Sequence, residues 1–439
     1  MIQTIKKAWA IPELRKKIVF TALMLLIFRI GNAIPVPYVN TELLGEYLNQ
    51  LSTTVLGLYN VMSGGAFAEA TVFALGVQPY INSSIIIQLL TIAIPALERL
   101  ARDGGEAGKK KIASITRYAT VAIALLQGFG YYMICKNYNI LEQQGIWPAL
   151  VIIVSFVAGS SFVMWLGEQV NEFGVGNGIS IILFAGILSR VPNMVTMGAS
   201  YIRTKGSIGY LWIALLIVGM LAMVVLIVHV NEAERRIPVQ YAKRQVGRKM
   251  YGGQASTLPM KVNMSGVLPI IFAQTIASLP ATIWAFIGTP EEGTVGRSIY
   301  NAIDTKSVLY LIVYFLMIIG FSYFYATIQF NPVEISNNLK RNGGFIPGVK
   351  PGKATVNYID TIMTRITLPG SIFLALVAIL PALAMKFLNI QQAFAYFYGG
   401  TSLLIMVGVI LDTLKQIESY LLMRHYDGLM KTGRIQGRY

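Results

Sequence analysis

The sequence has 439 residues, of which 55% are hydrophobic and only 13% are charged, with a mean hydropathy of +0.59. Soluble domains carry about 25% charged residues, so this composition excludes both a water-soluble globular protein and a disordered chain. The net charge is +16, and the chain has one cysteine, Cys135, and two histidines. These counts exclude an internal disulfide and argue against a structural metal or a histidine-based hydrolase.

The apolar segments are long enough to cross a membrane as helices, which takes about 20 apolar residues each. The ten candidate spans, in chain order, are 18–34, 72–96, 115–135, 148–166, 179–195, 210–230, 267–287, 308–330, 366–385 and 393–411. The first follows a basic stretch but lacks a small-residue cleavage site, so it is predicted to be a transmembrane helix rather than a signal peptide. We expect an all-α integral membrane protein of ten transmembrane helices.

Lys and Arg gather on one side of this predicted topology. Alternating the loops places 28 of the 36 Lys and Arg on the side of both termini and seven on the other, while Arg29 falls within the first span. Because cytoplasmic loops carry the positive excess, both termini are predicted to be cytoplasmic. The segments 1–17, 231–261, 331–365 and 412–439 are then cytoplasmic, and 196–209 is an external link between the halves 18–195 and 210–411.

Two short motifs recur at matching places in the two halves. The second span contains GVQPYI at 76–81 and the seventh GVLPII at 266–271, while the fifth span contains GISIIL at 178–183 and the tenth GTSLLI at 400–405. Because five is an odd number, such halves have opposite topology. The sequence therefore predicts two five-helix halves related as an inverted repeat around a central pore.

The repeat pairs aliphatic residues across the predicted axis. Ile81 is matched by Ile271 and Leu183 by Ile405, and Ile85 and Ile179 lie one helical turn away on the same faces. Any one of these residues could simply pack or face lipid. Together they predict a hydrophobic constriction, which can seal a pore against water and ions by dewetting.

The predicted spans contain almost no charged residues, and Gln88, Asn177 and Asn263 are among the few polar groups near them. Carriers of small solutes usually keep ionisable residues where the solute passes. A secondary transporter with a five-plus-five inverted repeat is the alternative, but it requires a polar site at the midplane. An intramembrane protease requires catalytic or metal-binding residues within the spans. Neither requirement is met by this sequence, and no cofactor is indicated.

The two long cytoplasmic loops are basic and patterned. The first, 231–261, contains the strand-like IPVQY at 237–241, and the second, 331–365, contains the turn-rich NGGFIPGVKPG at 342–352. Basic loops often only touch anionic lipid. The patterning suggests in addition a docking surface for an acidic protein or for an RNA phosphate backbone.

Six longer strings carry a resemblance to a known family. They are FALGVQPYINSSIIIQLL at 73–90, GNGISIILFAGI at 176–187, ERRIPVQYAKR at 234–244, LPMKVNMSGVLPIIFA at 258–273, FNPVEISNNLKRNGGFIPGVKPG at 330–352 and GGTSLLIMVGVILDT at 399–413. The sequence resembles the SecY family, the central subunits of the bacterial protein-export channel, over essentially all ten predicted spans. The resemblance implies a passive channel in the bacterial cytoplasmic membrane that passes unfolded polypeptides and releases transmembrane segments sideways into lipid. It implies no enzymatic activity.

The resemblance also implies roles for particular residues. The pore ring would comprise Ile81, Ile85, Ile179, Leu183, Ile271 and Ile405, and an external plug near 56–67 would include Ser63, Gly64 and Gly65. Gln88, Asn177 and Asn263 are assigned to the lateral gate, which lies between spans two and three and spans seven and eight. Arg235, Arg236, Lys243, Arg244, Arg248 and Lys350 are assigned to cytoplasmic docking.

The implied partners are the small membrane subunits SecE and SecG, the motor ATPase SecA, the ribosome, signal sequences, unfolded polypeptides and anionic lipid. One residue departs from the family, which usually has Arg where this chain has Lys350. Lysine keeps the charge but lacks the planar five-donor fork of arginine, so this contact is expected to be weaker or differently arranged.

Overall fold

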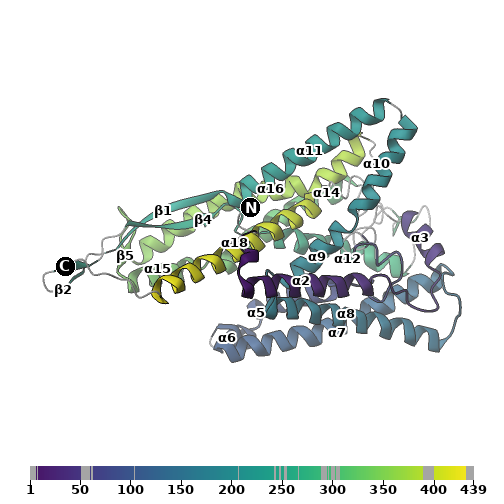
Figure 1. The fold of residues 1–439 in the computed structure, drawn as a ribbon, viewed down its shortest axis with the longest axis horizontal. Helices are drawn as coiled ribbons and strands as arrows, with labels where there is room; N and C mark the ends of the chain where they lie inside the picture. The colour runs from purple at the N-terminus through teal and green to yellow at the C-terminus, as the bar shows by residue number, and fades with distance from the viewer. Residues whose placement is uncertain are drawn as a thin grey trace.

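The computed structural model describes most of the chain. The described residues are 6, 8–50, 60, 63–102, 104–205, 207–241, 244–246, 249–251, 255–264, 266–287, 294, 296–297, 302, 307–388 and 400–431. Helices dominate, and a small β-sheet projects beyond them at one end (Figure 1).

A helix occupies the place of each predicted span in the first half. These helices are α2 (Pro12–Gly31), α5 (Gln78–Ala93), α7 (Gly105–Asn137), α8 (Ile146–Phe173) and α9 (Gly178–Leu188), with the shorter α3 (Thr41–Gln50) and α6 (Pro95–Arg102) between them. The chain bends by 106° between α5 and α6, at Ile94 and Pro95. The bend follows from proline, which cannot continue the hydrogen bonding of a preceding helix and disfavours helical geometry in the residue before it.

The predicted second half follows after a helical connection, α10 (Val191–Lys205). Its long helices are α11 (Ser207–Glu232), α12 (Leu268–Ile287), α14 (Val308–Gln329), α16 (Lys353–Leu388) and α18 (Gly400–Lys431). In both halves neighbouring helices pack in chain order: α5 on α7, α7 on α8 and α8 on α9, then α12 on α14, α14 on α16 and α16 on α18. The halves meet where α9 contacts α18 and α7 contacts α12.

Within the described residues, six helices are long and apolar enough to cross a membrane. They lie in Gly105–Asn137, Ile146–Phe173, Gly209–Glu232, Val308–Arg341, Lys353–Leu383 and Gly400–Met423, and the bent pair of α5 and α6 adds a seventh if it counts as one span. Two shorter apolar helices are Gly178–Asn193 and Leu268–Ala277. The structure is thus that of a mostly helical membrane protein.

The expectation of an all-α fold needs a correction at the two loops that were predicted to be cytoplasmic. Strands β1 (Glu234–Tyr241) and β4 (Ala255–Lys261) form an antiparallel pair, β5 (Gly344–Phe345) adds to the other edge of β1, and β2 (Arg244–Val246) and β3 (Lys249–Tyr251) form a separate hairpin. The strand-like pattern at 237–241 is confirmed as part of β1. Since β5 comes from the second loop, the two predicted loops form one structural unit.

This unit, which we call the cytoplasmic module after the predicted topology, has its own apolar core. The alternation of β1 turns two of its side chains inward, and they pack with residues of β4, of the turn after β5 and of α16. The buried residues are Ile237, Val239, Met260, Ile346, Ile359 and Met363. A short helix, α15 (Pro332–Arg341), begins with Asn331, whose side chain caps the backbone N–H groups of Val333 and Glu334.

Several predicted boundaries differ from the structure. The ninth span was expected from 366, but α16 begins at Lys353, because Ile359 and Met363 bury against the module and extend the helix beyond the membrane-like segment. The fifth span was expected to end at 195, but α9 ends at Leu188, and Pro192 lies in the first turn of α10, where proline is tolerated. The predicted link 196–209 is mostly helical.

Candidate functional site

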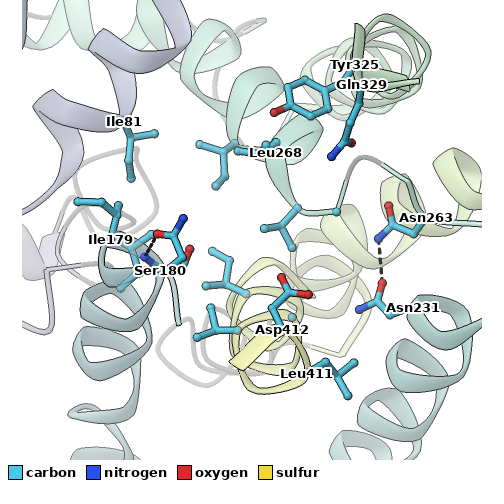
Figure 2. Close-up of a pocket in the computed structure, with 18 of the residues that line it drawn as sticks. Ile81, Ile179, Ser180, Asn231, Asn263, Leu268, Tyr325, Gln329, Leu411 and Asp412 are labelled. Carbon is cyan, nitrogen blue, oxygen red and sulfur yellow. Dashed lines mark hydrogen bonds between the residues drawn. The ribbon is translucent and has the colours of Figure 1, made fainter. Parts of the chain in front are cut away.

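Six aliphatic side chains from four helices meet around one cavity of about 570 Å³ (Figure 2). Ile81 and Ile85 come from α5, Ile179 and Leu183 from α9, Ile271 from α12 and Ile405 from α18. All but Ile271 are no more than 9% exposed, and Ile271 packs against the cluster that the other five share. The residues that the sequence repeat paired are therefore brought together between the two halves.

Matching backbone turns aim α5 and α12 at this cavity. Gly76 and Gly266 both have positive φ, +52° and +62°, a conformation that glycine adopts without steric cost. Each helix then begins two residues later, with proline as its second residue. The first helical hydrogen bonds also match, since Ile81 N–H donates to Val77 O at 3.0 Å and Ile271 N–H to Val267 O at 3.3 Å.

Matching glycines likewise begin α9 and α18. Gly178 lies against the backbone of α8 and Gly400 against the backbone of α16, and an added Cβ would collide with the carbonyl of Gly167 or of Val377 respectively. At α9 the side chain of Asn177 also accepts a hydrogen bond from Ser180 N–H at 3.2 Å, which caps the helix. These close approaches fix the first turns that present Ile179 and Ile405 to the cavity.

Polar groups line the end of the cavity that faces the cytoplasmic module. They come from the last turns of α11 and α14, from β4 and the residues after it, and from α18: Asn231, Glu232, Lys261, Asn263, Gln329, Asp412 and Lys415. In Figure 2 the apolar Ile81 and Ile179 lie across the cavity from Asn231 and Asn263, with the polar Ser180 beside Ile179. The cavity therefore has both an aliphatic and a polar lining.

One ion pair stands at this polar end. Lys415 Nζ lies 2.7 Å from Glu232 Oε1, with both side chains roughly half exposed. The hydrogen bond to Glu232 raises the pKa of Lys415 above its ordinary value, and the nearby carboxylate of Asp412 acts in the same direction. The direct contact of Lys415 is thus with Glu232 and not with Asp412.

The three polar residues assigned to the lateral gate all line the main cavity, but in different environments. Gln88 and Asn177 are exposed, whereas Asn263 is buried and its Nδ2 donates to Asn231 Oδ1 at 2.8 Å. Gln88 also lines a second cavity of about 220 Å³ between α5, α12 and α14, where Phe272 and Tyr325 face it. Helices of the two halves thus leave a hollow at the place where the gate is expected.

The described residues assigned to the plug pack near the end of α9, beyond the cavity-lining Leu183. Of the range 56–67, residues 56–59 and 61–62 lie outside the described part of the chain. Gly64 packs against Gly186 and Ser189 at the end of α9, and Asn32 Nδ2 donates to Ser63 O at 3.3 Å. Because Gly186 follows Leu183 by three residues, this segment lies about 4.5 Å further along α9 than the constriction.

The residues assigned to docking are dispersed over the cytoplasmic module. Arg235 and Arg236 are exposed on β1, where Arg236 Nε pairs with Glu234 Oε1 at 2.7 Å, and Lys350 is exposed after β5. Arg244 lies in β2, whereas Lys243 and Arg248 fall outside the described residues. The structure therefore joins the first loop and Lys350 in one unit.

Sequence reasoning missed the pairing of β1 with β5 and the helical residues 353–365. The spacing of Val356, Ile359 and Met363 was a usable signal for the helix, because apolar residues at intervals of three and four mark one helical face. It also missed Leu268 and Phe272, which line the main cavity beside Ile271. No local signal marks the two-residue strand β5.

Comparison with known proteins gives a consistent result. The family model described as SecY matches residues 71–414 of this chain. Protein translocase subunit SecY of Bacillus subtilis is 43% identical, and that of Streptomyces scabiei is 41% identical, each over 98% of this chain and 100% of its own length.

A solved structure shares the fold. It concerns a SecY protein whose plug domain stabilises the closed state of the translocation channel and maintains a membrane seal. It matches this chain with a TM-score of 0.60 at 18% identity, covering 98% of this chain and 99% of that chain. At this identity the likeness concerns the fold alone.

Proposed function

Because this chain belongs to the SecY family, it is a channel-forming subunit of a protein translocase in a membrane, and we propose that unfolded polypeptides cross it through the cavity between its two halves. The observation that carries this proposal is the convergence of six aliphatic side chains from α5, α9, α12 and α18 on that cavity. A channel with this lining needs no catalytic group, and we propose that the chain itself hydrolyses nothing. Family membership also decides against the secondary transporter.

The pore is proposed to lie on the axis of a five-plus-five inverted repeat of ten spans. The backbone supports this, since Gly76 and Gly266 share a positive φ and Gly178 and Gly400 share a close approach to the preceding helix. The order of helix packing supports it as well, because it is the same in α5 to α9 as in α12 to α18. Each half thus has one glycine in a turn with positive φ and one glycine that allows a close approach to another helix.

The six aliphatic residues are proposed to act as the pore ring. A narrow apolar passage empties of water easily, which blocks ions, whereas aliphatic side chains on separate helices can part for a polypeptide. The polar end near Asn231 and Glu232 would admit the chain from the side of the cytoplasmic module. An external plug that includes Ser63, Gly64 and Gly65 would close the other end.

The experiment that tests the ring replaces Ile81 or Ile405 by Asn in the full translocase, reconstituted in a planar bilayer. A hydrogen-bonding side chain keeps the passage wet, so the resting ion conductance should rise about tenfold or more in each variant, as expected for a loss of about 1.4 kcal/mol of sealing free energy. Leu368→Asn, at an exposed position on α16, is the control and should leave the conductance unchanged. Unchanged conductance in both Ile81→Asn and Ile405→Asn would contradict the proposal that these residues form a pore ring.

The lateral gate is proposed to open where α5 and α7 face α12 and α14. The second cavity beside Gln88 supports this position, because it already separates α5 from α14. Signal sequences and transmembrane segments would leave through it toward lipid, and Asn177 and Asn263 would line its polar end. A cysteine at Ile85 should then crosslink to a stalled secretory chain inside the pore.

The cytoplasmic module is proposed to dock the ribosome and the SecA motor, which supply the directional force. Its exposed Arg235, Arg236 and Lys350 would meet acidic groups or phosphates, with Lys243, Arg244 and Arg248 adding to the same charge. We propose that SecE, SecG and anionic lipid complete the assembly in the bacterial cytoplasmic membrane. The excess of Lys and Arg on one side supports a cytoplasmic location for both termini.

A further inference from the structure

Side chains from three other parts of the molecule donate hydrogen bonds to backbone carbonyls between residues 60 and 67. Arg190 Nη2 donates to Asn60 O at 3.0 Å, Ser189 Oγ to Gly64 O at 3.4 Å, and Tyr131 Oη to Phe67 O at 2.7 Å. Asn32 Nδ2 adds the bond to Ser63 O. The segment is therefore held through its backbone carbonyls as well as by the packing of the Phe67 ring on Tyr131.

Among these donors only Arg190 carries a charge, and it is poorly solvated. Its Nε is buried and has no hydrogen-bond partner within the described part of the chain. The Glu69 carboxylate attracts the guanidinium electrostatically, but no ion pair between them is formed within 4 Å in the described residues. A partly buried, incompletely bonded cation is costly, so its hydrogen bond to Asn60 O should contribute more than a bond at the surface would.

The opposing segment is shaped to admit the guanidinium. Gly65 has a φ of +99°, and a Cβ added there would lie 3.2 Å from Arg190 Nη2. Asn60 O also accepts from Gly65 N–H at 2.9 Å, so the arginine and the glycine meet at the same carbonyl. A side chain at residue 65 would displace either the arginine or the segment.

Arg190 is also tied to the constriction by a rigid element. It lies two residues after α9, which carries Ile179 and Leu183, and its own N–H donates to Ile187 O at 3.2 Å. The helix ends at Leu188, about 7.5 Å beyond Leu183, and Arg190 lies in the turn that follows. A displacement of α9 that widens the cavity would carry the guanidinium away from Asn60.

From these contacts we infer that Arg190 is the positioning residue that latches Asn60 and residues 63–65 against the closed constriction and releases them when α9 moves. The inference rests on the proposed function, in which these residues belong to the plug. It assigns to one partly buried cation the coupling between the ring and the plug.

The test measures the position of the segment directly. Ser63 is 6% exposed, so a Ser63→Cys variant in a Cys135→Ala background should react slowly with a membrane-impermeant maleimide added outside intact cells. Adding Arg190→Gln should raise the labelling rate about tenfold, the equivalent of 1.4 kcal/mol. Arg190→Lys should restore part of the protection, because it keeps the charge but not the fork. Arg203→Gln, on α10, is the matched control and should label as slowly as the parent.

A second variant tests the same contact with Arg190 intact. Gly65→Ala should raise the labelling of Cys at residue 63 to a similar extent, whereas Gly45→Ala, where an added Cβ meets nothing within 4 Å, should not. Unchanged labelling in both Arg190→Gln and Gly65→Ala overturns the latch. That result is distinct from failure of the proposed function, which is measured by the ion conductance of Ile405→Asn and does not involve Arg190.

Discussion

In the first half the chain turns into the cavity-lining helices α5 and α9 at Gly76 and Gly178, and in the second half it turns into α12 and α18 at Gly266 and Gly400. Gly76 and Gly266 share a positive φ, and Gly178 and Gly400 share a close approach to another helix, but the surroundings of the paired turns differ. At Gly76 an added Cβ would contact Phe73 O at 3.8 Å, whereas at Gly266 it would meet no atom within 4 Å.

This difference indicates which part of the repeat is constrained. The geometry that aims an aliphatic side chain at the cavity is retained in both halves, because it depends on two glycines and a proline. The space around the paired turns that precede α5 and α12 differs, because the two turns face different neighbours. Comparing the stability loss of the same substitution at two paired glycines therefore distinguishes an effect of the shared backbone geometry from an effect of the local surroundings.

The largest effect is expected at the close approaches. Gly178→Ala and Gly400→Ala should each lower the free energy of unfolding by about 3 kcal/mol, because the new methyl group collides with the backbone of the preceding helix. Thermal unfolding of the purified protein in detergent measures this. Gly408→Ala on α18, where a Cβ meets nothing, is the matched control and should be neutral or slightly stabilising. A large loss in one half only would break the equivalence of α9 and α18.

A smaller, equal effect is expected at the turns with positive φ that precede α5 and α12. Gly76→Ala and Gly266→Ala should each cost about 1–2 kcal/mol, since an L-residue in the left-handed region is strained whether or not space is available. The same unfolding assay applies. Because Gly266 has open space around it, a cost there comes from the backbone alone. If Gly266→Ala were neutral while Gly76→Ala was not, the two turns would not be under the same constraint.

The smallest effects are expected from ion pairs, which do not follow the repeat. Arg117 pairs with Glu168 between α7 and α8, whereas Lys415 pairs with Glu232 between α18 and α11. Both pairs are largely exposed, so Glu168→Gln and Glu232→Gln should each cost less than about 1 kcal/mol, and less in high salt. Chemical denaturation at low and high salt measures both differences.

The pH dependence of the second pair has a defined sign. The pKa of Lys415 is raised in the folded state, so its contribution is present below the ordinary lysine value of 10.5 and is lost as the pH rises through the higher folded value. Between pH 6 and about pH 9 the stability difference between the parent and Glu232→Gln should therefore be constant. If the stability difference changed within that pH range, a titratable group other than Lys415 would be responsible.

Much of the helical arrangement could be predicted because its signals are local. Runs of apolar residues located the helices, and Gly-Val-x-Pro located two of the turns that bring Ile81 and Ile271 to one cavity. The roles given to the ring, plug, gate and docking residues remain predictions that the proposed experiments can test.

The parts that could not be predicted depend on contacts between distant segments. The pairing of Gln240 with Phe345 joins the two long loops. The hydrogen bond from Arg190 to Asn60 joins residues that are 130 positions apart in the sequence. Neither has a periodicity or a motif of its own. Some helix ends differ from the predicted ones for the same reason. Helix α16 begins before the predicted residue 366 because Ile359 packs in the cytoplasmic module.

The sheet of the cytoplasmic module has a consequence for the order of biosynthesis. Strand β1 can pair with β4 soon after both are made, but Tyr241 must wait for Gly344. At roughly 5–20 residues per second, elongation through the intervening stretch takes on the order of 5–20 seconds. During that delay one edge of β1 is unprotected while α12 and α14 are synthesised. Closure of the sheet therefore follows the appearance of both helices and can serve as a late marker of a correctly assembled second half.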